Sequence, residues 1–225
     1  MISIHSLQKS YGSNKVLKGI DLQLEPGVIH GIVGENGAGK TTLFKCIAGL
    51  ESNEGKIDYA KGNLRNVTGF LPTNPYFLSK ITGAEYLQLL CNARNIQIDD
   101  MASQNIFELP LKQYADTYST GMKKKLALTA ILMQKNEVFV LDEPFNGVDI
   151  HSNIVIKEVL DKLRQLGKIV VLSSHIFSTL DETCDHLHYL KQGLISQSAV
   201  RGGFKAIEDQ MKLVGISAKI DNLKL

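Results

Sequence analysis

We expect an α/β fold with a parallel-sheet core, an N-terminal antiparallel β subdomain and an inserted helical subdomain. Two continuous apolar runs, 138–141 and 169–172, are typical of strands that are buried on both faces of a parallel sheet. Each run is followed by a segment with helical spacing of apolar residues, as alternating β and α units require. Segments near the start instead alternate apolar with polar residues, which favours strands with one exposed face.

The antiparallel part is predicted near the start of the chain. Three strand-like segments lie between Ile2 and Val33, and the alternation of Ile20, Leu22 and Leu24 is the clearest of them. Short strands are expected at 55–59 and 67–71. Pro72 and Pro75 then break the pattern.

The helical part is predicted to begin at Thr82-Gly83-Ala84-Glu85, which has the sequence of a capping box. Leu87, Leu90 and Cys91 then share one helical face. From there to about residue 130 we expect helix and no strand. We therefore place a helical subdomain at about 75–128, inserted into a single domain that covers 1–225.

The α/β alternation resumes at 138–141 and continues to the end of the recognisable pattern. We expect helices at about 154–163 and 176–184, with Gly167 ending the first, and a buried strand between them at 169–172. A strand pair is predicted around 186–195, and 204–214 is predicted to be one more helix.

Composition excludes several classes of protein. The net charge of +2 is too small to favour nucleic acid as the main partner. The run Lys123-Lys124-Lys125 is the kind of sequence that usually forms a solvated helix face. No stretch approaches 18 apolar residues, and the first residues lack the pattern of a signal peptide, so we expect a soluble, cytoplasmic protein. The three cysteines have no metal-ligand spacing and suit packing in a reducing compartment.

The strongest local signal is Gly34-Glu35-Asn36-Gly37-Ala38-Gly39-Lys40-Thr41-Thr42, which fits the P-loop pattern G-x-x-x-x-G-K-[S/T]. Glycines allow the loop to turn its backbone N–H groups toward one point, where a phosphate binds. A strand-like segment precedes the loop and a helical one follows, so the helix N-terminus favours the anion. We therefore predict a nucleoside triphosphate site with Mg²⁺, formed by Gly34, Asn36, Gly37, Ala38, Gly39, Lys40, Thr41 and Thr42.

Two carboxylates follow the buried strand 138–141. Asp142 and Glu143 lie at the carboxyl end of this strand, where open α/β sheets bind ligands. We expect Asp142 to join Thr41 at Mg²⁺, and Glu143 to polarise an attacking water.

A third motif lies shortly before that strand. In Tyr118-Ser119-Thr120-Gly121-Met122, Ser119 can cap a helix and present its N-terminus to an anion. The segment resembles the signature motif of the ATP-binding cassette family, which usually reads Leu-Ser-Gly-Gly-Gln. Other matches occur in the family's order, and together they cover about Ile2 to Ile195.

The resemblance implies a P-loop NTPase, RecA-like core and a set of residue roles. Tyr11 lies where the family places the aromatic ring that stacks on adenine. Asp149 resembles the acid that links two nucleotide sites in a dimer, and His175 resembles the switch histidine at the γ-phosphate. By the same resemblance Ser119 and Gly121 contact the nucleotide of a second cassette, while Glu143, His175 and Lys40 are catalytic.

The chain departs from the family pattern at one loop. Where the family usually has Gln after Leu-Pro, this chain has Thr73-Asn74. Thr73 is too short to copy the reach of Gln, and Asn74 copies it only if the loop shifts. Thr120 and Met122 also differ from the usual signature, but the contacts expected there come from Ser119 and backbone.

The resemblance implies an ATP-binding and ATP-hydrolysing subunit of a membrane transporter. Two cassettes, identical or related, would close on ATP and drive a separate integral membrane permease from its cytoplasmic face. The Met after Ser-Thr-Gly, the lysine run and the short C-terminus are similar to cassettes that serve exporters. An importer subunit and a regulatory or weakly hydrolysing cassette are the alternatives. The transported substrate is not encoded here, because recognition of cargo belongs to the permease.

Overall fold

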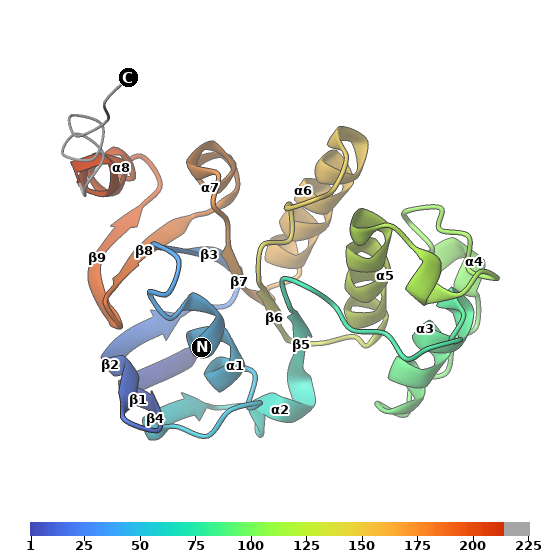
Figure 1. Ribbon diagram of the computed structural model, residues 1–225, viewed down its shortest axis with the longest axis horizontal. Coiled ribbons are helices and arrows are strands. Elements are labelled where there is room, and N and C mark those ends of the chain that lie inside the picture. The colour runs from blue at the N-terminus through green and yellow to red at the C-terminus, as the bar shows by residue number, and fades with distance from the viewer. Residues whose placement is uncertain (214–225) are drawn as a thin grey trace, which may run out of the picture.

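The larger of two sheets forms the centre of the molecule in the computed structural model, which describes residues 1–213 (Figure 1). Its strand order is β5-β6-β7-β3-β8-β9. The first five strands in this order run parallel, and β9 pairs antiparallel with β8. This confirms the predicted parallel-sheet core. The strands are β3 (Val28–Val33), β5 (Thr68–Leu71), β6 (Val138–Leu141), β7 (Ile169–Ser173), β8 (His186–Lys191) and β9 (Leu194–Val200).

The second sheet is antiparallel and comes from the N-terminal part of the chain. Its order is β2-β1-β4, and its strands are β1 (Ile2–Tyr11), β2 (Asn14–Leu24) and β4 (Glu54–Tyr59). The strands predicted at the start of the chain and at 55–59 are thus confirmed. A short helix, α2 (Leu64–Val67), was not predicted. The Asn63 side chain caps it by accepting a hydrogen bond from the Arg65 N–H, so Val67 ends a helix instead of starting β5.

Two apolar cores pack against the larger sheet, one on each of its faces. One core joins that sheet to α1 (Lys40–Ile47) and to the antiparallel sheet. The other core lies under α5, α6 (Ile150–Gln165), α7 (Phe177–Thr183) and α8 (Lys205–Leu213). The cysteines are free and buried in these cores, as their packing role predicts.

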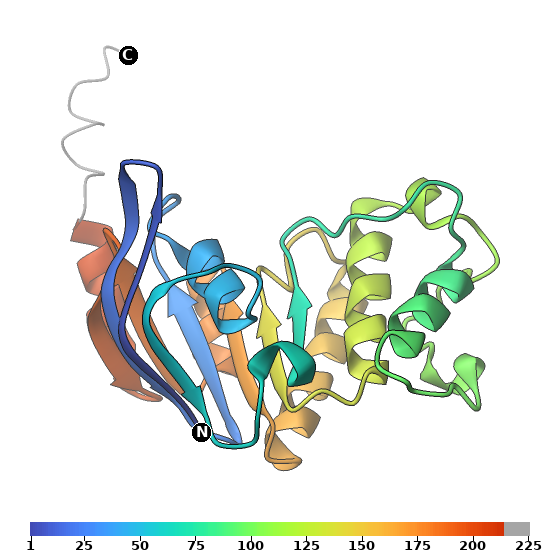
Figure 2. The same cartoon turned by 90° about the horizontal axis from the view of Figure 1, so that it is seen from below.

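The helical segments of the middle region lie beyond the β5 edge of the sheet (Figure 2). They are α3 (Gly83–Asn92), α4 (Met101–Gln104), the 3₁₀ turn η1 (Ala115–Thr117) and α5 (Thr120–Met133). The capping box at Thr82 and Glu85 is present as predicted. The proposed limits of the helical subdomain, 75–128, stay a prediction, and α5 continues past them.

The expectation of helix throughout this region is wrong between α3 and α4, where residues 93–100 are not helical, and between α4 and η1. The Asn105 side chain bonds both the N–H and the C=O of Leu109, which offers the backbone an alternative to helix. Pro110 follows, and it has no N–H for a helical hydrogen bond. The chain therefore forms an ordered loop there.

The last predicted helix begins close to its expected start, as α8. Its predicted end at Val214, and the last part of the proposed 1–225 domain, lie outside the described residues. Within residues 1–213 no helix combines the length and the apolar character that crossing a membrane requires.

The parallel strands bring four chain segments to one edge of the sheet. In the pairing registers Leu71 lies beside Leu141, and Leu141 beside Leu172. The residues that follow these strands therefore line up at the carboxyl edge, next to the loop after β3. The functional site is built there.

Candidate functional site

The loop between β3 and α1 has the backbone that its glycines permit. Gly37 and Gly39 have φ values of 82° and 110°, in the region that side chains disfavour. A Cβ on Gly34 would lie 2.2 Å from the carbonyl oxygen of Leu190, so this position also requires glycine. The loop thus folds tightly against β8 and leads into the N-terminus of α1.

Lys40 begins α1 and folds back over the loop. Its ammonium group donates hydrogen bonds to the carbonyl oxygens of Gly34 (2.7 Å) and Glu35 (3.1 Å). Burial lowers the pKa of Lys40, and the nearby carboxylates of Glu143 and Asp142 oppose that shift. The lysine is thereby held at the loop, with two acids close to it.

At the end of β6, three hydroxyl groups donate hydrogen bonds to the carboxylate of Asp142. Thr41 Oγ1 donates to Oδ2 at 2.7 Å and Thr73 Oγ1 donates to the same oxygen at 2.9 Å. Ser173 Oγ donates to Oδ1 at 2.7 Å. Carboxylate and hydroxyl oxygens are hard ligands, so this cluster fits the Mg²⁺ predicted at Thr41 and Asp142.

Glu143 is buried and has an unusual backbone. Its φ is 56°, in the left-handed region, and its side chain is only 5% exposed. The His175 N–H donates to Oε2 at 3.1 Å, and His175 Nε2 lies 3.1 Å from Oε1. Burial raises the pKa of Glu143, and His175 is the largest influence in the opposite direction. A carboxyl group with a raised pKa beside a histidine can accept a proton from water.

Lys124 departs from the expectation of a solvated lysine run. It is 2% exposed, and its ammonium donates to the carbonyl oxygens of Glu143 (2.7 Å) and Asn146 (2.9 Å). The neighbouring Lys125 pairs with Asp149 at 3.2 Å. Through these contacts both lysines hold the loop that follows β6.

A cavity of about 480 Å³ lies over the loop and the acids. Of the predicted site residues, nine line it: Asn36, Gly37, Gly39, Lys40, Thr41, Thr42, Asp142, Glu143 and His175.

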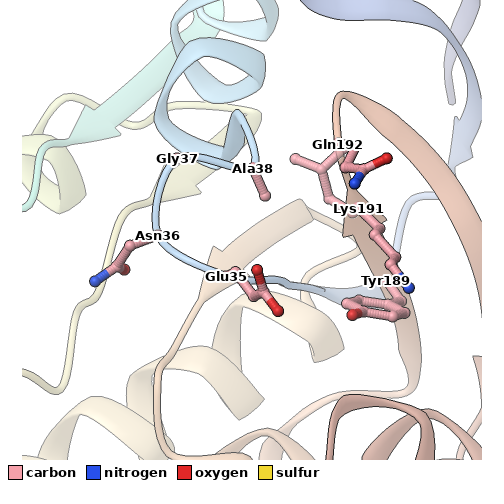
Figure 3. Close-up of a pocket in the computed structure, with 8 residues that line it drawn as sticks. Glu35, Asn36, Gly37, Ala38, Tyr189, Lys191 and Gln192 are labelled. Atoms are coloured by element: carbon pink, nitrogen blue, oxygen red, sulfur yellow. The ribbon is translucent and has the colours of Figure 1, made fainter. Parts of the chain in front are cut away.

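Ala38 lies on the other side of the loop. It lines a smaller cavity of about 210 Å³ between the loop and β8, where Figure 3 shows it near Gln192 and shows Asn36 pointing the opposite way. Gly34 packs on the backbone of β8, as described above.

Three predicted residues on α5 and α6 do not line the larger cavity. Ser119 is exposed and caps α5 by accepting from the Met122 N–H at 3.2 Å. A Cβ on Gly121 would lie 2.5 Å from the Gly147 carbonyl oxygen, so the helix packs closely on that loop. Asp149 caps α6 through the Ser152 N–H at 2.9 Å.

Tyr11 is also separate from that cavity. Its ring is 44% exposed at the end of β1, and Lys9 Nζ lies 5.0 Å from the ring centroid. Its role with adenine stays a prediction.

The sequence reasoning missed three contributors. It gave no role to Ser173, which also accepts from the Glu143 N–H at 3.0 Å, and none to Lys124. It treated Thr73 only as a missing Gln, yet Thr73 reaches Asp142. A polar residue next to the end of a buried parallel strand was the available signal for Ser173 and Thr73.

Comparison with known proteins shows the family of the chain. A family model described as ABC transporter matches residues 17–146, more than half of the chain. The chain is 31% identical to the bacitracin transport ATP-binding protein BcrA of Enterococcus faecalis, with 86% of this chain and 67% of that one covered. It is 26% identical to the lantibiotic transport ATP-binding protein SrtF of Streptococcus pyogenes, over 93% and 95%.

A solved structure shares the fold. It is a dimeric, post-hydrolysis state of an ATP-binding cassette bound to ADP and Pi, with a TM-score of 0.81 and 21% identity, covering 91% of this chain and 100% of that one. The P-loop, the acids after β6 and these matches all indicate an ATP-binding cassette. The chain therefore belongs to the ABC transporter family, as one of its ATP-binding subunits and an ATPase.

Proposed function

We propose that this chain hydrolyses ATP to power a separate membrane permease, and that the transporter is an exporter. The observation that carries the proposal is the arrangement of Lys40, Asp142, Glu143 and His175 around one cavity at the P-loop. These groups combine phosphate binding, metal binding and activation of water, which phosphoryl transfer requires.

The residues present fit ATP with Mg²⁺. The P-loop N–H groups and Lys40 suit the phosphates, and the oxygens of Thr41 and Asp142 already lie 2.7 Å apart. When bound, Mg²⁺ would neutralise negative charge on the phosphate oxygens.

Glu143 is proposed to orient and deprotonate the attacking water. Its backbone is held by Ser173 and Lys124, and its carboxylate is held by the His175 N–H. Lys40 and His175 are proposed to stabilise charge on the phosphoryl group during transfer.

A second cassette is proposed to complete the site. Ser119 is exposed at the N-terminus of α5, and it does not line the cavity of its own chain. A helix N-terminus attracts an anion, so Ser119 and Gly121 of one cassette would meet the ATP held by the other. Asp149 would lie between the two sites. The structural neighbour described above is a dimer with ADP and Pi, which supports this assembly. The second cassette is another copy of this chain or a related cassette.

The permease is proposed to dock on the helical region from the cytoplasmic side of the membrane. Apolar side chains are exposed there, at Tyr76 (82%), Leu78 (54%), Leu89 (47%) and Tyr114 (50%). Exposed apolar side chains that gather in one region favour contact with a protein partner. The names of two relatives, a bacitracin and a lantibiotic transport ATP-binding protein, support a role in transport.

The test is phosphate release by the purified chain with its co-expressed permease, compared with Glu143→Gln. We expect the variant to keep ATP affinity and to lose hydrolysis by about 100-fold or more, as for removal of a general base. Glu182→Gln, an exposed position, is the control and should keep full activity. Undiminished hydrolysis in Glu143→Gln would contradict the role of Glu143.

Two other functions would give different results. Absence of hydrolysis in the wild-type complex, with ATP binding intact, would favour the regulatory cassette. ATP-dependent uptake by the reconstituted complex in inverted and right-side-out vesicles would distinguish an importer from an exporter.

A further inference from the structure

Three histidines from neighbouring strands lie together on one face of the larger sheet, away from the P-loop cavity. His30 is on β3, and His186 and His188 are on β8. In the parallel pairing His30 lies beside His186, and Ile32 lies beside His188. Side chains two residues apart on a strand point to the same face, so this pairing brings the three rings together.

The rings are close enough to share one ion. His30 Nδ1 and His188 Nε2 are 3.2 Å apart, and one nitrogen from each of the three rings lies within 4.8 Å of the others. Tetrahedral zinc binds imidazole nitrogens at 2.0–2.1 Å, which places two ligand atoms about 3.3 Å apart. His30 Nδ1 and His188 Nε2 already have nearly this spacing. The His186 side chain is 32% exposed, so neighbouring residues do not enclose its ring on every side.

Hydrogen bonds give partners to only some of the polar groups in this cluster. His30 and His188 bond each other, the Glu25 N–H donates to His30 Nε2 at 3.1 Å, and His188 Nδ1 bonds Ser198 Oγ at 2.8 Å. These contacts satisfy both buried rings in neutral form. They leave out the His186 ring and one carboxylate oxygen.

That oxygen is Glu25 Oε2, which is buried and has no hydrogen-bond partner. It lies 3.3 Å from His30 Nε2 and 3.9 Å from His186 Nδ1. A buried carboxylate oxygen without a partner is costly, so its position beside two imidazoles of the cluster points to a bound cation.

We propose that His30, His186 and His188 form a binding site for one Zn²⁺-like transition metal ion. His30 Nδ1 and His188 Nε2 are two ligands and His186 is the third. The His30 proton then lies on Nε2 and is donated to Glu25 Oε2, so this nitrogen no longer accepts a hydrogen bond from the Glu25 N–H. Such a carboxylate–histidine–metal arrangement orients the ligand, and Ser198 does the same for His188.

The test is calorimetric titration of Zn²⁺ into the full-length protein, freed of metal and carrying no histidine tag. We expect one ion per chain. Loss of an outer carboxylate costs about 10–100-fold in affinity, so Glu25→Gln should weaken binding by that factor. His186→Gln should weaken it by at least about 100-fold, since it removes a ligand. His186 is partly exposed, so this variant should keep its circular dichroism spectrum and its ATP affinity.

His5→Gln and His175→Gln are the matched controls, because one histidine is exposed on β1 and the other lies at the P-loop cavity. Both should bind Zn²⁺ like the wild type. With Co²⁺, the visible bands of a tetrahedral ion should appear in the wild type and disappear in His186→Gln. Equal Zn²⁺ affinity in the wild type and His186→Gln would overturn the proposal. So would loss of binding in His175→Gln, which would assign the ion to the ATP site.

Discussion

At the scale of single residues, the backbone of Glu143 is the feature that the site depends on most. A left-handed conformation costs a residue other than glycine roughly 1–2 kcal/mol. Two buried side chains hold it: Ser173 accepts from its N–H, and Lys124 donates to its carbonyl oxygen. The strained conformation directs the carboxylate into the cavity beside His175.

The first prediction concerns Lys124. Lys124→Met keeps an apolar stem but leaves the carbonyl oxygens of Glu143 and Asn146 without this donor. The Glu143 carbonyl is the buried one of the two, and an unsatisfied buried carbonyl costs about 1–3 kcal/mol. We expect lower stability in urea unfolding and a fall in kcat with little change in ATP affinity. Lys123→Met, on the same helix, is the control. If both variants hydrolyse ATP at the same rate, Lys124 does not position Glu143.

The second prediction concerns Thr73. Thr73→Val keeps the shape of the side chain but removes its hydrogen bond to Asp142. A hydrogen bond to a charged carboxylate contributes about 1.5–3 kcal/mol, so the Mg²⁺ concentration for half-maximal ATPase should rise roughly 10- to 150-fold. Thr73→Ser keeps the hydroxyl group and should behave like the wild type. An unchanged Mg²⁺ requirement in Thr73→Val would show that this loop does not act through Asp142.

At the scale of elements, an ion pair joins the starts of two parallel strands. Glu137 precedes β6 and Lys168 precedes β7, and Lys168 Nζ lies 2.6 Å from Glu137 Oε1. Hydrogen bonding to Lys168 holds the pKa of Glu137 below its usual value, with weaker help from Lys61. A lowered carboxyl pKa stabilises the fold above the unfolded pKa of about 4.5, and this contribution is lost as the pH falls through the folded value.

The third prediction follows from this pair. Glu137→Gln should lower the free energy of unfolding at pH 7 by at most about 1 kcal/mol, because the Glu137 side chain is 37% exposed and water screens it. The difference from the wild type should shrink as the pH is lowered below about 4.5. Denaturant unfolding over a pH series measures it. Glu158→Gln, an exposed position on α6, should show no such dependence. A difference that grows on acidification would contradict the assignment.

The elements that the sequence predicted well are those with strong periodicity or a cap. The buried runs of β6 and β7 and the capping box of α3 are examples, because each depends on a few neighbouring residues. The loop at 105–114 was missed because one side chain, Asn105, redirects the backbone by bonding Leu109. A hydrogen bond from one side chain to the backbone does not change the pattern of apolar residues in the sequence, so periodicity does not reveal it.

Within the site, the sequence predicted motifs better than contacts between motifs. The P-loop and the Asp142-Glu143 pair have fixed spacing along the chain. The contacts of Thr73 and Ser173 with Asp142 depend on β5 and β7 both lying next to β6. Strand order was not part of the prediction, and it decides which hydroxyl groups reach the acid.

At the scale of the whole molecule, the P-loop and Ser119, which are both proposed to contact ATP, lie on two separate surfaces. The P-loop begins α1 on one face of the larger sheet, while Ser119 begins α5 near its β5 edge (Figure 1). Beside Asp149, Ile150 is 83% exposed and Ile154 is 52% exposed at the start of α6. Exposed isoleucines next to a conformationally fixed loop are suited to contact with another chain.

The fourth prediction is that these isoleucines lie in the interface of the ATP-bound dimer. In the Glu143→Gln background, which should retain ATP, light scattering with ATP should report a dimer. Adding Ile150→Asp places a charge in that interface and should leave a monomer that still binds ATP, since Ile150 does not line the cavity. Leu166→Asp, at the other end of α6 and 57% exposed, is the matched control and should leave the dimer intact. A dimer that survives Ile150→Asp but not Leu166→Asp would mean that the chains associate through the opposite end of α6, and that Ser119 does not reach the ATP of a second copy.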